Sequence, residues 1–293
     1  MRMLIPAFRF LVFSNIYVAL CAMTFTAKTS LLLYGNNGNI RVNALVFSAT
    51  LFLYCFHRLY HRSKMLPEER AEERHQWADR NKMAFITITV VAFISSLLLM
   101  LYMPLKIWLL LIPVAVLGLG YSLPCIPSAK GWIRLRDISW LKIVWIALAY
   151  AWLTTFIPVA YAGHLKDIYS PGVLFVFIRS FIVVFVLVIP FDIRDIQHDS
   201  KNGVKSLPVL IGVDKTTSVA YTVLILFALA VIAQLRFFNL SIPLAIALLI
   251  SAIEIAVVVP IGKTAKRDLF YPLAIETSMI LHWLLLYIAV KMV

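Results

Sequence analysis

Three aspartates stand where a long apolar run of the chain ends, and their spacing suits metal binding. Asp192, Asp195 and Asp199 follow one another at positions i, i+3 and i+7. On a continuous α-helix this spacing places the carboxylates within about 60° of one another around the axis. They repel one another unless a cation lies between them, and Mg²⁺ prefers such oxygen ligands. The spacing therefore predicts a Mg²⁺ site, with a solvated helix end carrying three acids as the alternative.

Basic residues directly follow the aspartates. Lys201 and Lys205 flank a short segment that contains Asn202 and Gly203. Their ammonium groups are suited to neutralise the negative charge that a metal ion leaves on a phosphorylated ligand. The segment from 191 to 208 therefore predicts a site where Mg²⁺ holds a phosphorylated ligand.

The composition indicates that this site belongs to a membrane protein. Hydrophobic residues make up 62% of the 293 positions and charged residues only 14%, which is far from the balance of a soluble globular domain. We therefore expect an all-α polytopic fold. At about 20 residues per crossing, the pattern predicts nine spans, at 10–27, 42–56, 83–103, 105–123, 140–161, 172–191, 217–235, 240–260 and 269–290. The second span is short by hydropathy, and we expect it to continue into His57 and Arg58.

The basic residues are distributed as in a membrane protein and not as in a nucleic-acid-binding one, although the formal net charge is +13. The N-terminal segment and the connections after even-numbered spans hold 20 Lys and Arg residues, and the opposite connections hold five. By the positive-inside rule, the N-terminus and the aspartates are cytoplasmic and the C-terminus lies on the opposite side. We expect one domain over residues 1–293 in a bacterial-type cell membrane, with cytoplasmic cap loops at 57–82, 124–140 and 192–216.

The end of the second span carries groups that suit phosphate binding. It holds two pairs spaced i, i+4, which are His57 with His61 and Arg58 with Arg62. This basic helix face contains no acid. It is either an anion-binding surface or an anchor whose side chains extend to the lipid headgroups.

The chain resembles the UbiA superfamily of intramembrane prenyltransferases over essentially its whole length. The run from Asp192 to Pro208, with Gly203 and the closing Ser-Leu-Pro, looks like the family's second aspartate-rich motif. Tyr121-Ser122 resembles the Tyr-Ser/Thr element that follows the family's fourth span. Lys142 lies where family members often place a phosphate-facing basic residue. The resemblance implies a nine-helix bundle around a central cavity that opens to the cytoplasmic side.

The resemblance also implies an activity, which is Mg²⁺-dependent transfer of a prenyl group from a polyprenyl diphosphate to an aromatic or lipid acceptor within the membrane. It implies catalytic roles for the three aspartates, as Mg²⁺ ligands, and for Tyr121 at the phosphate end of the pocket. It further implies that basic side chains contact the diphosphate, namely His57, Arg58, Arg62, Lys142, Lys201 and Lys205.

One segment, from Tyr54 to Arg62, departs from the family pattern. The family's first motif has the form Asn-x-x-x-Asp with a further Asp, whereas this segment has Cys55 and basic residues in place of acids. Two outcomes stay open: arginines replace one metal and bind the diphosphate directly, or the protein binds a lipid or diphosphate without turnover. A secondary transporter is a third hypothesis, based on repeat-like spans and the in-span charges Arg179, Glu254 and Glu276.

Overall fold

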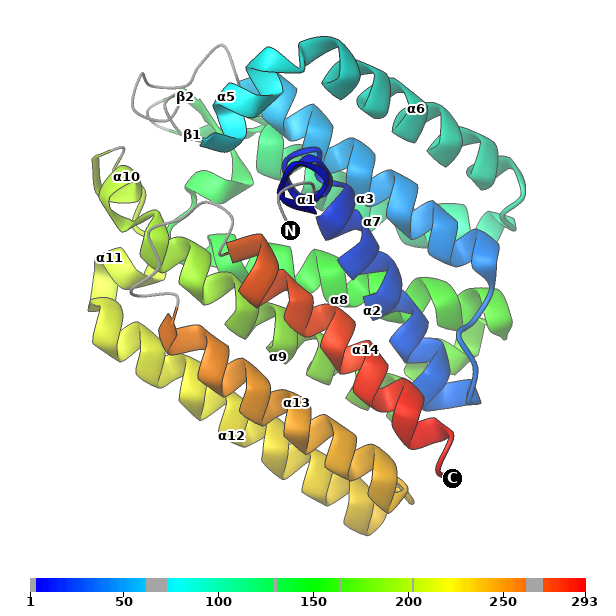
Figure 1. The fold of residues 1–293 in the computed structure, drawn as a ribbon. Helices are drawn as coiled ribbons and strands as arrows, with labels where there is room; N and C mark the ends of the chain where they lie inside the picture. Colours follow the sequence, from blue (N-terminus) through cyan, green and yellow to red (C-terminus); the bar gives the residue numbers. More distant parts are fainter. Residues whose placement is uncertain (1–3, 62–72, 129–130, 164, 202, 262–270) are drawn as a thin grey trace.

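The computed structural model describes residues 4–61, 73–128, 131–163, 165–201, 203–261 and 271–293. Within these residues, nine helices are long and apolar enough to cross a membrane, and Figure 1 shows them as one bundle. Eight are α2 (Ile16–Tyr34), α3 (Ile40–His61), α6 (Lys82–Leu101), α7 (Leu105–Ser122), α8 (Leu141–Ala162), α9 (Pro171–Arg194), α12 (Val213–Phe237) and α13 (Ile242–Ile261). The ninth, Leu273–Val290, combines most of the π-helical turn η4 (Tyr271–Glu276) with α14 (Thr277–Val290). The predicted polytopic helical fold is confirmed.

Short elements connect these helices. They are α1 (Leu4–Phe13), α5 (Glu73–Arg80), α10 (Ile196–Lys201), α11 (Leu207–Ile211), and the 3₁₀ turns η2 (Leu135–Asp137) and η3 (Leu165–Tyr169). An antiparallel hairpin of β1 (Ile126–Ser128) and β2 (Gly131–Ile133) is a small departure from the all-α prediction. Pro124 lies just after the end of α7, and it cannot continue a helical hydrogen-bond ladder. In Figure 1, α5, α10, α11 and the hairpin lie at one end of the bundle.

The first span begins later than predicted. The sequence predicts 10–27, but the chain turns at Ser14 and Asn15, where Asn15 has φ 65°, and the membrane-length helix starts at Ile16. Hydropathy does not reveal this break, because α1 is as apolar as the span that follows it. Lys28, at the predicted end of that span, is 1% exposed in the interior of α2 and donates to Ser180 Oγ at 2.5 Å. The second span does continue past residue 56, as predicted, and ends at His61.

Helices α8 and α9 pack along each other in the middle of the bundle, and α8 also contacts α2 and α7. Helix α9 is apolar on nearly all sides, with Val183, Val186 and Ile189 buried, which is the pattern of a central helix. Ala147 and Ala151 of α8 are completely buried, and such small side chains allow membrane helices to approach closely. The aspartate-bearing end of α9 is therefore held by the best-packed pair of helices.

Candidate active site

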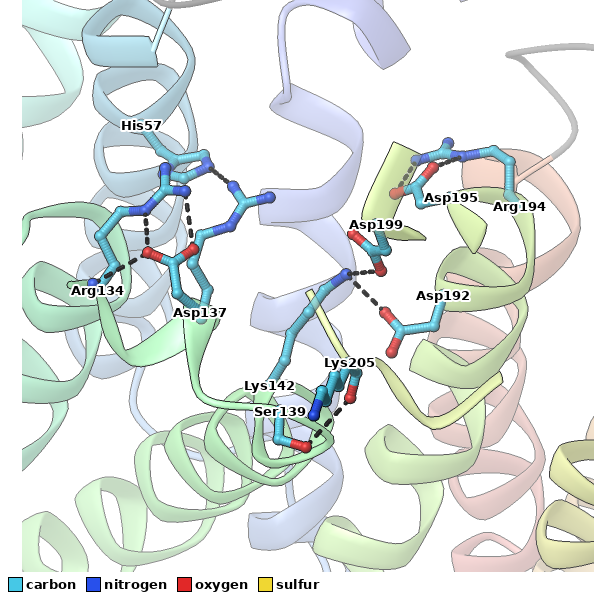
Figure 2. Close-up of polar contacts among 11 residues, drawn as sticks. His57, Arg134, Asp137, Ser139, Lys142, Asp192, Arg194, Asp195, Asp199 and Lys205 are labelled. Atoms are coloured by element: carbon cyan, nitrogen blue, oxygen red, sulfur yellow. Dashed lines mark hydrogen bonds and ion pairs between the residues drawn. The ribbon is translucent and has the colours of Figure 1, made fainter. Parts of the chain in front are cut away.

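Two of the three aspartates converge on a lysine. Asp192 lies in the last turn of α9, and Asp199 lies on α10. Lys142 Nζ, from the first turn of α8, lies 2.9 Å from Asp192 Oδ1 and 3.2 Å from Asp199 Oδ2. Figure 2 shows the ammonium group between the two carboxylates. All three side chains are buried, with 8%, 1% and 2% exposure for the lysine, Asp192 and Asp199. They form an ion-pair cluster largely shielded from solvent.

The third aspartate does not share this meeting point. Asp195 caps the end of α9 and accepts hydrogen bonds from Arg194 Nε at 2.7 Å and from its terminal nitrogen at 3.1 Å (Figure 2). Burial acts to raise the pKa of Asp195, but the charge and hydrogen bonds of Arg194 outweigh it and hold the pKa below its ordinary value. The expectation of one shared helix face is corrected, because α9 ends at Arg194 and α10 begins at Ile196.

A basic wall is built from α3, α7 and the turn η2. Ser122 Oγ donates to Gly118 O at 3.2 Å and lies 2.9 Å from His57 Nδ1. Because the hydroxyl proton is already used, this pattern assigns the imidazole proton to Nδ1 and leaves Nε2 as an acceptor. Arg136 approaches that Nε2 through a long contact of 3.5 Å. His57 therefore orients the guanidinium of Arg136.

Tyr121 packs against the basic wall. Its ring is 5.9 Å from the His57 ring, and the Arg136 guanidinium lies over it at 5.8 Å. Tyr121 is also within electrostatic range of Lys142. The structure thus brings together His57, Tyr121 and Lys142, which the sequence predicted for the site. Arg136 is a residue of this wall that sequence reasoning missed, because in the sequence it is one of several basic residues in a loop.

A backbone contact joins the loops on the two sides of the site. Ser139 Oγ donates to the carbonyl oxygen of Lys205 at 3.2 Å (Figure 2). The side chains of Lys201 and Lys205 are themselves exposed. Next to this contact, Arg134 binds both carboxylate oxygens of Asp137 at 2.8–2.9 Å. Burial acts to raise the pKa of Asp137, but the hydrogen bonds and charge of Arg134 lower it overall.

A sequence model of the UbiA prenyltransferase family matches residues 80–284. The chain belongs to this family. The matched range includes the aspartates of α9 and α10, and it begins after the divergent segment at the end of α3. No curated protein sequence matches the chain.

Solved structures of UbiA homologues share the fold at low sequence identity. A homologue from Archaeoglobus fulgidus bound to GPP and Mg²⁺ superposes with a TM-score of 0.61 at 15% identity, covering 97% of this chain and 99% of that one. The apo homologue from Aeropyrum pernix K1 gives 0.64 at 15%, covering 95% and 98%. A structure described for digeranylgeranylglyceryl phosphate synthase gives 0.61 at 14%, covering 97% and 98%. The UbiA-type bundle is therefore confirmed.

In this UbiA-family chain, Arg58 is engaged in helix packing. Its guanidinium donates to Phe13 O at 2.6 Å and to Asn15 Oδ1 at 2.7 Å, and it lies over the Phe85 ring at 5.5 Å. These contacts fasten α3 to the break between α1 and α2 and to α6. The two arginines predicted for the diphosphate are thus not seen together there, because Arg58 faces the helix break and Arg62 lies outside the described residues.

A second polar group is formed by side chains of α2, α3, α8 and α14. Tyr54 Oη of α3 and Tyr150 Oη of α8 are 3.3 Å apart, and Tyr17 Oη forms a hydrogen bond with Thr277 Oγ1. Glu276, the last residue of η4, interacts electrostatically with both tyrosines of the first pair. This polar group was not predicted as a unit, because its members come from four separate helices.

An apolar hollow lies apart from these polar residues. Its volume is about 490 Å³, and it lies between α2, α3 and α6. Aliphatic and aromatic side chains dominate its lining, with Phe47, Leu51 and Ile88 among them. None of the aspartates or basic residues described above contributes to it, so the polar site belongs to the other face of α3.

The residues of the ion-pair cluster suit a single Mg²⁺. Asp192 and Asp199 direct oxygens at one point, and Asp192 Oδ2 has no hydrogen-bond partner among the described residues. Mg²⁺ commonly uses one or two carboxylates and completes its shell with substrate phosphate oxygens and water. The described residues form no cluster of three or more His, Cys, Asp or Glu ligands. The donor set therefore fits one metal ion that shares its coordination with a phosphorylated ligand.

Proposed function

We propose that the protein transfers a prenyl group from a polyprenyl diphosphate to an aromatic or lipid acceptor in the membrane, with the help of Mg²⁺. The observation that carries this proposal is the convergence of Asp192, Asp199 and Lys142 at the end of the central helix pair. Membership of the UbiA family supports it, as does the homologue whose structure contains GPP and Mg²⁺.

In this proposal the two converging aspartates hold the metal ion, and Lys142 contacts the diphosphate. Bound Mg²⁺ would supply Lewis-acid stabilisation of the charge that develops on the leaving diphosphate. Arg136, oriented by His57, supplies guanidinium donors that match phosphate oxygens. Tyr121, which lies against Arg136, is assigned to the phosphate end of the pocket. The basic wall thereby takes over the role of the carboxylates that the family's first motif would provide.

The reaction breaks the bond between the allylic carbon and the diphosphate oxygen, and the electron pair leaves with the diphosphate. The acceptor supplies the electron pair of the new bond and loses a proton. Helices α3 and α8 border the space where this occurs and limit the access of water to the allylic cation. Tyr54 and Tyr150 provide aromatic faces in that region, which can stabilise a cation.

Several further assignments belong to the same proposal. The N-terminus and the site face the cytoplasm, the C-terminus lies on the opposite side, and residues 1–293 act as one domain. The exposed Lys201 and Lys205 attract the diphosphate to the site by long-range electrostatics. Arg58 supports the site through the helix break that it fastens. Asp195 joins the metal ligands once Arg194 releases it.

The test is a turnover assay on the full-length protein in lipid nanodiscs. Geranyl diphosphate and longer prenyl diphosphates are supplied with Mg²⁺ and a panel of phenolic and lipid-alcohol acceptors. We expect Mg²⁺-dependent release of diphosphate that is abolished by Asp192→Asn and retained by Asp214→Asn, an exposed position in the first turn of α12. If no pairing gives Mg²⁺-dependent release, the enzymatic proposal is rejected.

A non-catalytic binding protein is the second candidate. It is favoured by one observation, which is that the described part of the segment from 54 to 62 contains no acid to hold a second metal ion. This candidate predicts that radiolabelled geranyl diphosphate binds to the protein and is recovered intact. Recovery of free diphosphate or of a prenylated acceptor excludes it.

A further inference from the structure

The ammonium group of Lys142 occupies the point where the metal ligands converge. Its Nζ lies 2.9 Å from Asp192 Oδ1 and 3.2 Å from Asp199 Oδ2 (Figure 2). Both are ion-pair distances, and the contact with Asp199 is also a hydrogen bond that the ammonium group donates. A cation that is coordinated by both carboxylates must lie in nearly the same place. The lysine and the metal ion therefore compete for one position.

Burial makes this competition strong. The lysine side chain is 8% exposed and the two carboxylates are 1% and 2% exposed. Two positive charges a few ångströms apart repel each other much more in a buried site than in water. Since the ammonium already neutralises one of the two carboxylate charges, a metal ion that arrives alone gains little from the pair. The site is consequently a poor one for free Mg²⁺.

A diphosphate changes this balance, because it provides new anionic oxygens for the ammonium group. Lysine carries its charge on a flexible stem of four carbons. Lys142 is the second residue of α8, so the helix fixes its backbone and only its side chain has to move. Once the ammonium follows the diphosphate, both carboxylates are released to the metal ion that accompanies it.

We propose that Lys142 is an internal counter-ion that blocks the metal position until a prenyl diphosphate arrives, so that the metal ion and the diphosphate bind together. The proposal rests on the proposed function, since it concerns the order in which that site is filled. The ion pairs of Lys142 stabilise the site without a metal ion, because both buried carboxylates already have a cationic partner. Lys142 also prevents the protein from binding a divalent cation that carries no substrate.

The experiment measures metal binding directly, without turnover. Mn²⁺ is titrated into the full-length protein in nanodiscs, in mildly alkaline buffer, and free Mn²⁺ is followed by electron paramagnetic resonance. Each titration is done alone and with geranyl S-thiolodiphosphate, whose C–S bond resists ionisation. For the wild type we expect weak binding of Mn²⁺ alone and binding that is at least about tenfold tighter with the analogue.

The variant Lys142→Met removes the competing charge. We expect it to bind Mn²⁺ alone at least about tenfold more tightly than the wild type, and to gain less from the analogue. The matched control is Lys215→Met, which removes the same charge from an exposed position near the start of α12 and should behave as the wild type. Lys142→Gln carries the same expectation as Lys142→Met and retains a hydrogen-bond donor, in case the methionine variant does not fold.

Two outcomes overturn the inference. One is that the folded Lys142 variants bind Mn²⁺ alone no better than the wild type. The other is that the wild type binds Mn²⁺ equally well with and without the analogue. Neither readout depends on an acceptor or on catalysis, so failure of prenyl transfer and failure of this inference are distinguishable. A wild type that turns over but whose lysine variants gain no metal affinity leaves the proposed function intact and rejects this inference alone.

Discussion

The two helix ends that border the site handle charge in opposite ways. At the end of α9 and on the adjoining α10, the buried carboxylates of Asp192 and Asp199 share one lysine that comes from α8. At the end of α3, the ionisable groups in the described residues are basic or neutral, and His57 and Arg58 each contact polar partners on other elements. The two carboxylates next to the end of α9 therefore hold a cation, whereas the end of α3 carries basic side chains of its own.

The two basic residues at the end of α3, His57 and Arg58, have different roles. His57 contacts Ser122 and Arg136 and so belongs to the wall that faces the ion-pair cluster. Arg58 is its neighbour in sequence, but it points toward the break between α1 and α2. A helix rotates by about 100° per residue, which sends adjacent side chains to different neighbours. The guanidinium near the site therefore comes from Arg136, on a separate loop.

The largest expected effect tests whether Asp199 and Asp195 have different roles. We expect Asp199→Asn to lower the rate of Mg²⁺-dependent diphosphate release by about 100-fold or more, because it removes one of two converging ligands. Asp195→Asn should lower it only about tenfold, since that carboxylate is paired with Arg194. Release from geranyl diphosphate, measured side by side, checks this. Equal losses for the two variants would show that all three aspartates act as equivalent ligands.

The next effect tests whether the basic wall binds the diphosphate. Arg136→Met should weaken the binding of geranyl S-thiolodiphosphate by about 10- to 100-fold, because a guanidinium that contacts phosphate contributes about 1.5–3 kcal/mol. The matched control is Arg236→Met, which removes the same side chain from an exposed position near the end of α12. Isothermal titration in nanodiscs provides the affinities. Unchanged affinity in Arg136→Met would remove the basic wall from the site.

A smaller effect separates Arg58 from Arg136. Arg58→Met loses two hydrogen bonds from a charged group, so we expect the free energy of unfolding to fall by about 2 kcal/mol. Its affinity for the thiolodiphosphate should change less than that of Arg136→Met. Reversible denaturation in detergent micelles and the same titration measure the two quantities. A loss of affinity without a loss of stability would place Arg58 at the diphosphate instead.

The smallest effect concerns the loop that carries Arg136. Asp137 has a lowered pKa in the folded protein, so its pairing with Arg134 stabilises the fold above the ordinary aspartate pKa of about 3.9. This contribution is lost as the pH falls from there through the lower folded value. Asp137→Asn should cost about 0.5–1 kcal/mol at neutral pH, and its difference from the wild type should shrink at acidic pH. Thermal unfolding at several pH values checks this, and a constant difference would contradict it.

The sequence was sufficient for the features that depend on local composition. Nine apolar runs predicted nine membrane-length helices, because each crossing needs its own length of apolar residues whatever its neighbours are. The run from Asp192 to Pro208 was sufficient for the family, since its residue types and spacing are contained in one short segment. Boundaries were less well predicted. The break at Asn15 was missed because hydropathy does not distinguish α1 from the span that follows it. The burial of Lys28 was missed because hydropathy does not show whether a lysine faces the interior of the bundle.

What only the tertiary structure decided is which charged groups meet. The spacing of the aspartates assumed one continuous helix, but the end of α9 at Arg194 sends Asp195 toward Arg194. The meeting of Lys142 with Asp192 and Asp199 joins residues that are 50 and 57 positions apart. No local pattern encodes such a contact, because it depends on how α8 packs against α9. The sequence by itself determined that this chain carries an aspartate-rich segment in a UbiA-type bundle, and the packing of α8 on α9 decided that a lysine lies between two of its carboxylates.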